Sequence, residues 1–279
     1  LESFSVNADL VEYGSIFRSS AQKVAEVLNQ YSAQLYELKE QYTYNTGIAV
    51  AKVNQSLIAL AALNKQIKGE IIQGSTPNEL MDSRNMILDD LAGLIGIHYE
   101  TIADGQVSVS LGGKYLLDAS KGNKLETLTL DSSSSDSLRV VYEDGTDAEI
   151  PKGSIGGYLS YVNGKGSFAV PGEDSTLGIN YFIKSMDAFA QSFADNFNAI
   201  NDPSGFNRLF TASDGGTAIT AGNIKLSDAW IADAMFITRS TTSAGTAAND
   251  NLLKMIESLD AKHSIGTQFN GSFAEYVSS

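Results

Sequence analysis

The sequence predicts an α+β protein, in which an elongated helical bundle domain carries a small inserted antiparallel β domain. Three observations support this class. Apolar residues recur at helical spacing up to Ile95, the period changes to 2 at His98, and helical spacing returns after about residue 175. We therefore expect a rod-like helical domain from residues 1–96 and 172–279, and a β domain with a Gly-rich return segment in residues 97–171.

The first helix is predicted by an unbroken heptad row, which is typical of a long helix packed along another helix. No Gly or Pro lies between Ile16 and Tyr44. The row changes phase near Gly47 and resumes at Val53, so we expect one bent helix or two helices end to end, stopped by Gly69 and the stretch 73–75. The first row consists of Phe17, Ala21, Val24, Leu28, Tyr31, Leu35, Leu38 and Tyr42.

The second helix has a well-specified start. The run Thr76-Pro77-Asn78-Glu79 has the form of a capping box with proline at the first helical position, and Gly96 is placed to end the helix. We expect this helix to fold back antiparallel on the first. Arg84 is expected to reach a carboxylate on the long helix or the β domain, with an intersubunit contact as the alternative. The predicted structural junction comprises Thr76, Pro77, Asn78, Glu79, Asp82 and Arg84.

The remaining elements follow from the same two periods. About six short strands separated by turns are expected between residues 98 and 150, and residues 151–174 are expected to be irregular apart from a helical turn near Leu159. A third helix is expected from Ser175 or Thr176 to about Ile200, with a row of phenylalanines on one face. Residues 206–248 are expected to be extended, residues 249–262 helical, and a further helix is expected from Phe269.

The composition limits the class of partner. The chain has 33 acidic and 19 basic residues and a formal charge of −14, and its basic residues are scattered. Nucleic acid and anionic membrane are therefore not expected as partners. The chain has no cysteine, and it shows no run of about 18 apolar residues and no signal-peptide pattern, which is compatible with the cytosol or with export in an unfolded state.

No motif for catalysis, cofactor binding or metal binding is found. Neither of the two histidines, His98 and His263, belongs to a zinc or catalytic pattern, and both are expected to be structural. The acidic run at residues 143–147 lacks the ligand spacing of a calcium loop and is expected to be a hairpin turn. We therefore predict a protein without enzymatic activity, with no catalytic residues, no cofactor and no metal.

Several short motifs resemble the flagellar hook-associated protein 1 family. Residues 63–67 and 78–84 are similar to its Leu-Asn-x-x-Ile and Asn-Asp-Leu-Leu-Asp-Gln-Arg-Asp patterns. Segments at residues 187–190, 198–201, 221–224 and 269–273 agree with the family in order and spacing. Met81, Ser83 and Asn85 depart from the pattern, and the coiled segments that the family carries at both ends are missing. We expect a core fragment trimmed at both ends.

The resemblance implies a structural subunit that joins hook to filament at the bacterial flagellum. Its implied partners are the hook protein, the second junction protein and further copies in a ring, with an export chaperone that needs the missing C-terminal segment. It implies an extracellular location, reached without a cleavable signal peptide. The alternatives are another flagellar axial protein (flagellin or the second junction protein), an extracellular adhesin or carbohydrate-binding module, which would expose Tyr99, Tyr115 and Tyr142 on one sheet face, and a hydrolase with two convergent carboxylates.

Overall fold

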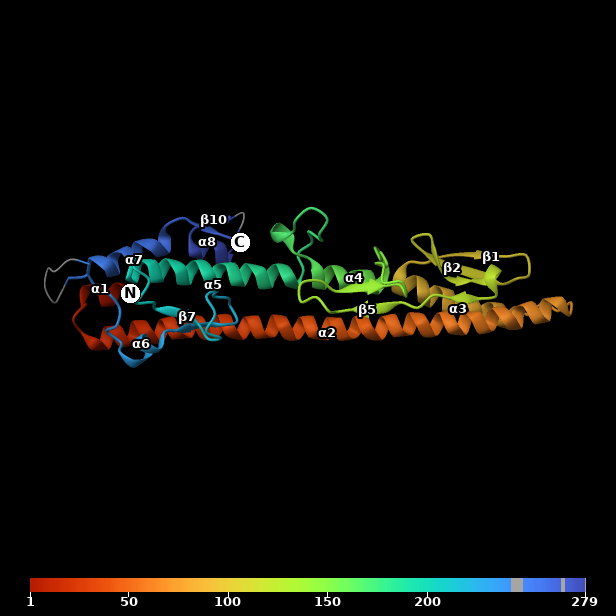
Figure 1. The fold of residues 1–279 in the computed structure, drawn as a ribbon, viewed down its shortest axis with the longest axis horizontal. Helices are drawn as coiled ribbons and strands as arrows, with labels where there is room; N and C mark the ends of the chain where they lie inside the picture. Colours follow the sequence, from red (N-terminus) through yellow and green to blue (C-terminus); the bar gives the residue numbers. More distant parts are fainter. Residues whose placement is uncertain (242–247, 267–268, 279) are drawn as a thin grey trace. The chain divides into compact units, whose positions relative to one another are not determined.

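The fold was obtained as a computed structural model and is described for residues 1–241, 248–266 and 269–278 (Figure 1). The chain divides into two compact units. Unit 1 consists of Leu1–Glu37, Lys165–Ser175 and Tyr181–Ser279. Unit 2 consists of Leu38–Gly164 and Thr176–Asn180. Long helices and small antiparallel sheets occur together, which confirms the α+β class.

The first helix is a single element. Helix α2 runs over Val11–Ile72, 62 residues; it begins earlier than the heptad row predicted and ends directly before the stretch 73–75 that was expected to stop it. It continues through Gly47, whose cost inside a helix is only about 1 kcal/mol. Buried neighbours offset this cost, because Ala49, Val50 and Val53 all pack into the core of unit 2.

The same helix contains a window of high mean hydropathy in which polar residues are interspersed. One 18-residue window in α2 has a mean hydropathy of 1.4, and 39% of it is buried in the protein. By length and composition alone this window could cross a membrane, although core helices pass the same test. This finding is compatible with the absence of an uninterrupted run of about 18 apolar residues, because a mean hydropathy tolerates interspersed polar residues.

Unit 1 is built on the N-terminal part of α2 and on α5, Ile179–Asn201, around an aromatic core. Trp230 is fully buried, with its ring 5.6 Å from that of Phe17 and 5.7 Å from that of Phe210. The remaining elements are α1 Glu2–Val6, η2 Gly166–Phe168, β7 Phe210–Ala212, β8 Ile224–Leu226, α6 Asp228–Ala232, α7 Asp250–Asp260, β9 His263–Ile265, β10 Phe269–Gly271 and α8 Phe273–Ser278.

Two expectations for unit 1 need correction. Phe269 lies in a strand, because β10 pairs with β9, and the last helix begins only at Phe273. Residues 206–248 are not simply extended, since β7 pairs antiparallel with β8 and α6 follows; residues 242–247 lie outside the described part of the chain. The predicted helix over residues 249–262 is confirmed as α7.

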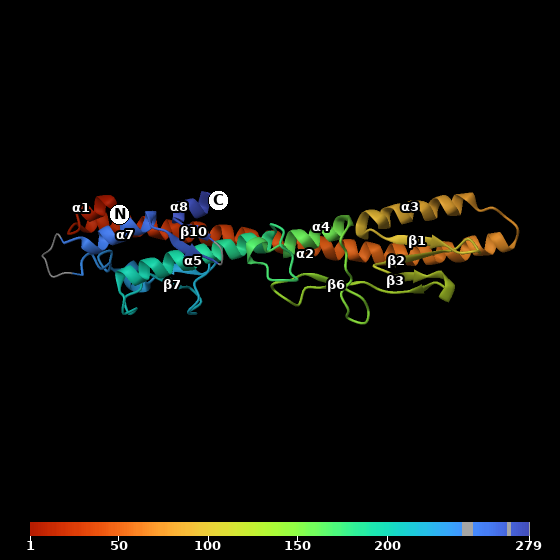
Figure 2. The ribbon, with the colours of Figure 1, turned by 90° about the horizontal axis from the view of Figure 1, so that it is seen from above.

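Unit 2 packs a four-stranded antiparallel sheet, in the order β1-β2-β3-β4, along the C-terminal part of α2 (Figure 2). Its aliphatic core includes Leu57, Leu60, Leu91, Val109 and Leu117. The elements are α3 Asn78–Ile95, β1 His98–Thr101, β2 Val107–Leu111, β3 Lys114–Asp118, η1 Ala119–Lys121, β4 Lys124–Leu125, β5 Thr129–Asp131, β6 Arg139–Val141 and α4 Gly153–Asn163.

Helix α4 is longer than the helical turn expected near Leu159, while residues 164–174 are irregular apart from η2, as predicted. The glycines of α4 lower its helix propensity, but they allow the start of α4 to lie close to the end of α3. A Cβ at Gly153, where φ is +79°, would lie 2.4 Å from the backbone of Leu94. Ile155 and Val162 of α4 are fully buried. The core of unit 2 therefore joins α3 and α4 to the strands, and the division at residues 97 and 171 stays a prediction.

Candidate interaction surface

The start of α3 differs from the predicted capping box. Pro77 is the N-cap residue rather than the first helical residue, and no side chain caps the helix. Thr76 uses its carbonyl, which accepts from the backbone N–H of Asn78 at 2.9 Å, and the Glu79 side chain is exposed. In a capping box the hydroxyl of the N-cap residue accepts from the N–H of the third helical residue. Because Pro77 and not Thr76 occupies the N-cap position, the Thr76 hydroxyl does not make this bond. The predicted Gly96 end is confirmed, with φ +59°.

Arg84 connects α3 to the first hairpin, although not through a carboxylate. Its Nη1 donates to the carbonyl oxygen of Gly105 at 3.0 Å, and its Nη2 donates to Oδ1 of Asn85 at 3.2 Å. Asp82 is exposed and takes no part in this contact. The ion pair at this end instead joins Lys68 of α2 to Asp104, at 2.9 Å. The hydrogen bond with Lys68 lowers the pKa of the Asp104 carboxyl below its usual value.

Two asparagines of α2 make contacts that the sequence reading did not single out. The side chain of Asn64 is fully buried, accepts from the N–H of Val107 at 2.9 Å and donates to its carbonyl oxygen at 2.8 Å. Asn54 makes the same pair of bonds with Leu128, at 3.0 and 2.8 Å. An amide side chain satisfies both backbone groups of one residue in this way. Asn64 belongs to the Leu-Asn-x-x-Ile motif, which was the available signal.

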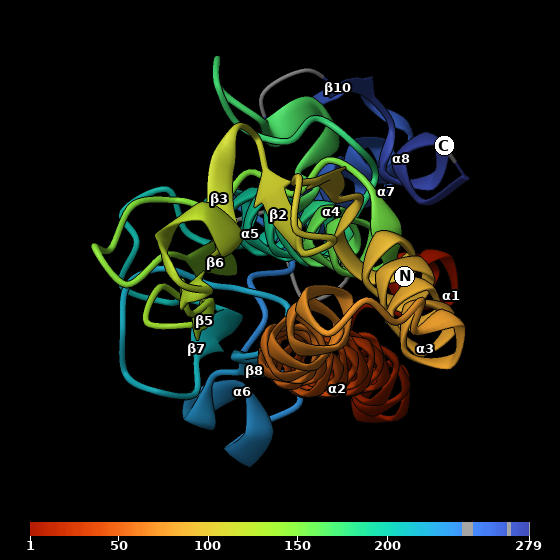
Figure 3. The same ribbon diagram turned by 90° about the vertical axis from the view of Figure 1, so that its right-hand side faces the viewer.

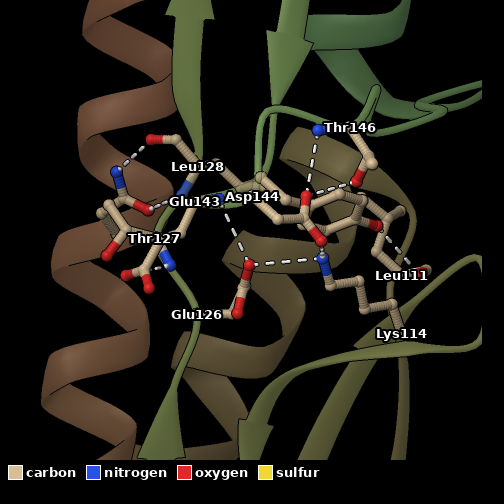
Figure 4. Close-up of polar contacts among 10 residues, drawn as sticks. Leu111, Lys114, Glu126, Thr127, Leu128, Glu143, Asp144 and Thr146 are labelled. Atoms are coloured by element: carbon tan, nitrogen blue, oxygen red, sulfur yellow. Dashed lines mark hydrogen bonds and ion pairs between the residues drawn. The ribbon is translucent and has the colours of Figure 1, made fainter.

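A charged cluster connects three segments of unit 2 (Figure 4). Nζ of Lys114 lies 2.8 Å from Oδ2 of Asp144, 3.4 Å from Oε1 of Glu126 and 3.9 Å from the ring centroid of Tyr142. The hydrogen bond with Lys114 holds the pKa of the Asp144 carboxyl well below its usual range. The cluster therefore fastens β3 to the residues that follow β4 and β6.

The acidic run at residues 143–147 forms the expected hairpin turn. Gly145 has φ +78°, and its N–H donates to the carbonyl oxygen of Tyr142. Oδ1 of Asp144 accepts from both the N–H and the hydroxyl of Thr146, which occupies it within the turn (Figure 4). Within the described residues, no group of three or more His, Asp or Glu side chains could hold a metal ion.

The two histidines occupy different environments. His98 begins the exposed strand β1. His263 lies in unit 1, where its Nε2 is 2.6 Å from the carbonyl oxygen of Ser258, its Nδ1 is 3.4 Å from Nδ2 of Asn196, and its ring stacks on Phe273 at 4.3 Å. The carbonyl can only accept, so Nε2 carries the proton and Nδ1 accepts from Asn196. This arrangement holds α7 and the following hairpin against α5.

The aromatic cluster required by the adhesin alternative is not formed. Tyr99 pairs with Val109 and Tyr115 pairs with Ser110, and because neighbouring residues of β2 point to opposite faces, the two tyrosines do not share one. Tyr115 donates to Glu100 at 2.7 Å, and Tyr142 is 7% exposed. These three tyrosines therefore do not form the shared exposed face that would favour the adhesin alternative, although Tyr99 and Tyr115 are themselves exposed.

The hydrolase alternative needs two convergent carboxylates, one of them with a raised pKa. Carboxylates converge on Lys114 and on Arg139, but there the pKa values of Asp144 and Asp131 are lowered. The carboxyl of Asp187 in α5 has a raised pKa, and burial is the cause. Its Oδ1 accepts from the N–H of Ala221 at 2.9 Å, which fixes a loop of unit 1 to the helix. A structural hydrogen bond of this kind accounts for the position of the group.

Unit 1 carries an apolar groove of about 550 Å³. The heptad row lies at its edge: Ala21 and Leu28 are buried, whereas Val24 and Tyr31 are 38% and 55% exposed. An exposed apolar groove is typical of an interaction surface rather than of a catalytic site. Its lining is Ser20, Lys23, Val24, Val27, Leu28 and Tyr31 of α2, Ser185, Met186 and Phe189 of α5, and Tyr276 and Val277 of α8.

Comparison with known proteins gives a consistent result. The family model described as the flagellar hook-associated protein FlgK helical domain matches residues 1–207. The chain is 28% identical over 191 residues to flagellar hook-associated protein 1 of Salmonella typhimurium, covering 63% of this chain and 32% of the relative. It is 25% identical over 222 residues to the protein of the same name from Bacillus subtilis, covering 72% of this chain and 43% of the relative.

A solved structure shares the fold. The flagellar hook junction protein FlgK from Burkholderia pseudomallei aligns with a TM-score of 0.58 at 23% identity, covering 78% of this chain and 38% of that one. The chain thus spans less than half the length of these relatives.

Proposed function

Because the chain belongs to the flagellar hook-associated protein FlgK family, we propose that it is part of a structural, non-enzymatic subunit that joins the hook to the filament of the bacterial flagellum. The match of the family model over residues 1–207 carries this proposal. The names of the relatives favour the junction protein over flagellin or the second junction protein.

The proposed partners are the hook protein on one side, the second junction protein on the other, and further copies of the chain in a ring. The proposed location is outside the cell, reached by export without a cleavable signal peptide. An export chaperone would bind only a form that carries the C-terminal segment of the longer relatives. Nucleic acid, membrane and cofactors are not among the proposed partners.

The structure supports a load-bearing role through its contacts rather than through any reactive group. Helix α2 is one uninterrupted element of 62 residues. The side chains of Asn54 and Asn64 and the ion pair of Lys68 hold loops and strands against it. The charged groups with clearly shifted pKa values in unit 2 are neutralised by neighbours at turns and strand ends. Such groups stabilise a fold and are not available for proton transfer.

Complementation in a junction-deficient strain tests the proposal. The terminal segments of the Salmonella relative would be grafted onto residues 1–279, and filament attachment would be scored by electron microscopy and swimming assays. We expect attached filaments with the chimera and none with a control that carries the terminal segments alone. A chimera that is exported and folded but leaves the filaments unattached would contradict the junction role.

A further inference from the structure

Helix α2 carries a further heptad row in unit 2, on the side away from the core. This row differs from the one that resumes at Val53, which is buried. Tyr44, Ile48, Ala51, Gln55, Ile58 and Ala62 follow one another at spacings of four, three, four, three and four residues. All six side chains are exposed. The three large apolar side chains among them, Tyr44, Ile48 and Ile58, are 71%, 54% and 59% exposed.

The row is open to an incoming helix. The strands and α3 of unit 2 lie on one side of α2 when the unit is viewed along the helix (Figure 3). The row itself contains no charged residue over about 27 Å of helix, counted at 1.5 Å per residue. An uncharged row of a and d positions is the surface on which another helix packs.

The residues of the row pair well with the same row in reverse. In an antiparallel arrangement Tyr44 lies opposite Ala62, Ile48 opposite Ile58, and Ala51 opposite Gln55. Large side chains then face small ones, and the two isoleucines meet each other. In a parallel arrangement Tyr44 would face Tyr44 and Ala51 would face Ala51, which alternates crowding and gaps.

Charge at the two ends of the row selects the same orientation. Glu40 stands beyond one end and Lys65 beyond the other, and both are exposed. Neither forms an ion pair or a side-chain hydrogen bond within the described residues. Antiparallel copies place Glu40 of one beside Lys65 of the other at both ends, whereas parallel copies would place like charges together.

We propose that this outer row of α2 is a self-association surface, which binds the same row of a second copy in antiparallel orientation. The contact is isologous, with one two-fold axis near the middle of the row. A single pair of helices of this length buries little area, so the association is weak and concentration-dependent. An antiparallel pair differs from the contacts that close a ring, so this proposal does not rest on the proposed function and can fail independently of it.

Disulfide mapping tests the orientation. Because the chain has no native cysteine, only the introduced cysteines can form disulfides. Tagged Ile48→Cys and untagged Ile58→Cys would be mixed under mild oxidation, with Met86→Cys, at a 72% exposed position of α3, as the control for random collision. We expect the mixed Ile48→Cys with Ile58→Cys dimer to form faster than any same-variant dimer. Preferential same-variant dimers would indicate parallel packing, and rates equal to the control would indicate no contact; either result overturns the proposal.

Sedimentation equilibrium of the unmodified chain tests the interface itself. Ile58→Glu is expected to weaken the dimer at least about tenfold, and Met86→Glu to leave it unchanged. Glu40→Lys and Lys65→Glu are each expected to weaken it about threefold, and the double exchange to restore it. Circular dichroism would establish that each variant is folded. A chain that stays monomeric at millimolar concentration, or an Ile58→Glu variant that dimerises as strongly as the original chain, would refute the surface.

Discussion

The two units are held together by different side chains. In unit 1 aromatic rings form a continuous set of contacts, from Phe17 through Trp230 and Phe210 to Phe193 and Phe273. In unit 2 the core is aliphatic, and polar groups secure its narrow sheet to α2. The aromatic core therefore distinguishes unit 1, and the aliphatic core with its charged clusters distinguishes unit 2. Amide side chains bonded to backbone occur in both units, since Asn198 pairs with both backbone groups of Phe210.

The two units should therefore lose stability in response to different substitutions. Removing a large ring leaves a cavity that the surrounding structure fills only in part. Removing one partner of a buried hydrogen bond leaves a polar group without water and without a partner. Acid should destabilise either unit wherever a carboxylate is stabilised in its charged form, as at Asp131 and Asp144 in unit 2 and at Asp250 in unit 1.

The largest expected effect is in unit 1. Trp230→Ala should reduce the free energy of unfolding by about 3–5 kcal/mol, because the side chain is fully buried between Phe17 and Phe210. Urea unfolding followed by circular dichroism would measure the loss. Phe206→Ala is the matched control, since Phe206 is 90% exposed and its removal should change stability by less than about 0.5 kcal/mol. Equal effects at the two positions would mean that the aromatic core does not hold unit 1.

A milder substitution of Trp230 separates the contribution of its ring volume from that of its indole N–H. The indole N–H of Trp230 is buried and has no hydrogen-bond partner in the described structure. Trp230→Phe keeps the ring contacts and removes this orphan donor, so it should cost clearly less than Trp230→Ala. If the two variants unfold at the same urea concentration, ring volume is not what Trp230 contributes.

The next effect is in unit 2. Asn64→Ala should reduce the free energy of unfolding by about 2–4 kcal/mol, because it leaves the N–H and carbonyl of Val107 unpaired in a buried site. Hydrogen exchange at Val107 should accelerate by the corresponding factor. Gln66→Ala, at an exposed position of the same helix, is the control and should be nearly neutral. Unchanged exchange at Val107 in the Asn64 variant would refute the role of this amide.

A smaller effect should appear on acidification. Hydrogen bonds from Ser133, followed by the Arg139 guanidinium, lower the pKa of Asp131 to about 2. A carboxyl with a depressed folded-state pKa stabilises the protein above its unfolded pKa of about 3.9, and this contribution is lost as the pH falls toward 2. Thermal unfolding between pH 5 and pH 2 should therefore fall less steeply in Asp131→Asn than in the original chain. Parallel pH profiles would contradict the assignment.

The heptad rows and the change of period were sufficient to predict the α+β class, the long first helix and the helix at α7. They predicted only a helical turn near Leu159 where α4 lies, because glycine has a low helix propensity. The close packing of Gly153 on Leu94 and of Gly156 on Ile150, which requires glycine, is not visible in the sequence. The rows also misplaced exposure: Val24 and Tyr31 belong to a groove, and which face of a long helix is covered depends on elements distant in sequence.

The junction role of residues 76–84 stays a prediction, and the structure shows which contacts these residues make. Arg84 does fasten α3 to the β segment, but its acceptor is the carbonyl of Gly105, which no charge pattern reveals. Asn54 and Asn64 were missed because a single amide inside a helix carries no periodic signal. Bidentate contacts to backbone depend on register, and register is set only once the strands pair.

The smallest expected effect concerns the start of α3 and separates the predicted capping box from the observed cap. A threonine N-cap typically contributes about 0.5–2 kcal/mol, so Thr76→Ala would cost that much if its hydroxyl capped the helix. Because Pro77 occupies the cap and no side chain bonds there, Thr76→Ala should change the free energy of unfolding by less than about 0.5 kcal/mol. Ser227→Ala is the matched positive control, since the Ser227 hydroxyl accepts from the N–H of Trp230 at the start of α6. A loss at Thr76 as large as that at Ser227 would restore the capping box and shift the start of α3 by one residue.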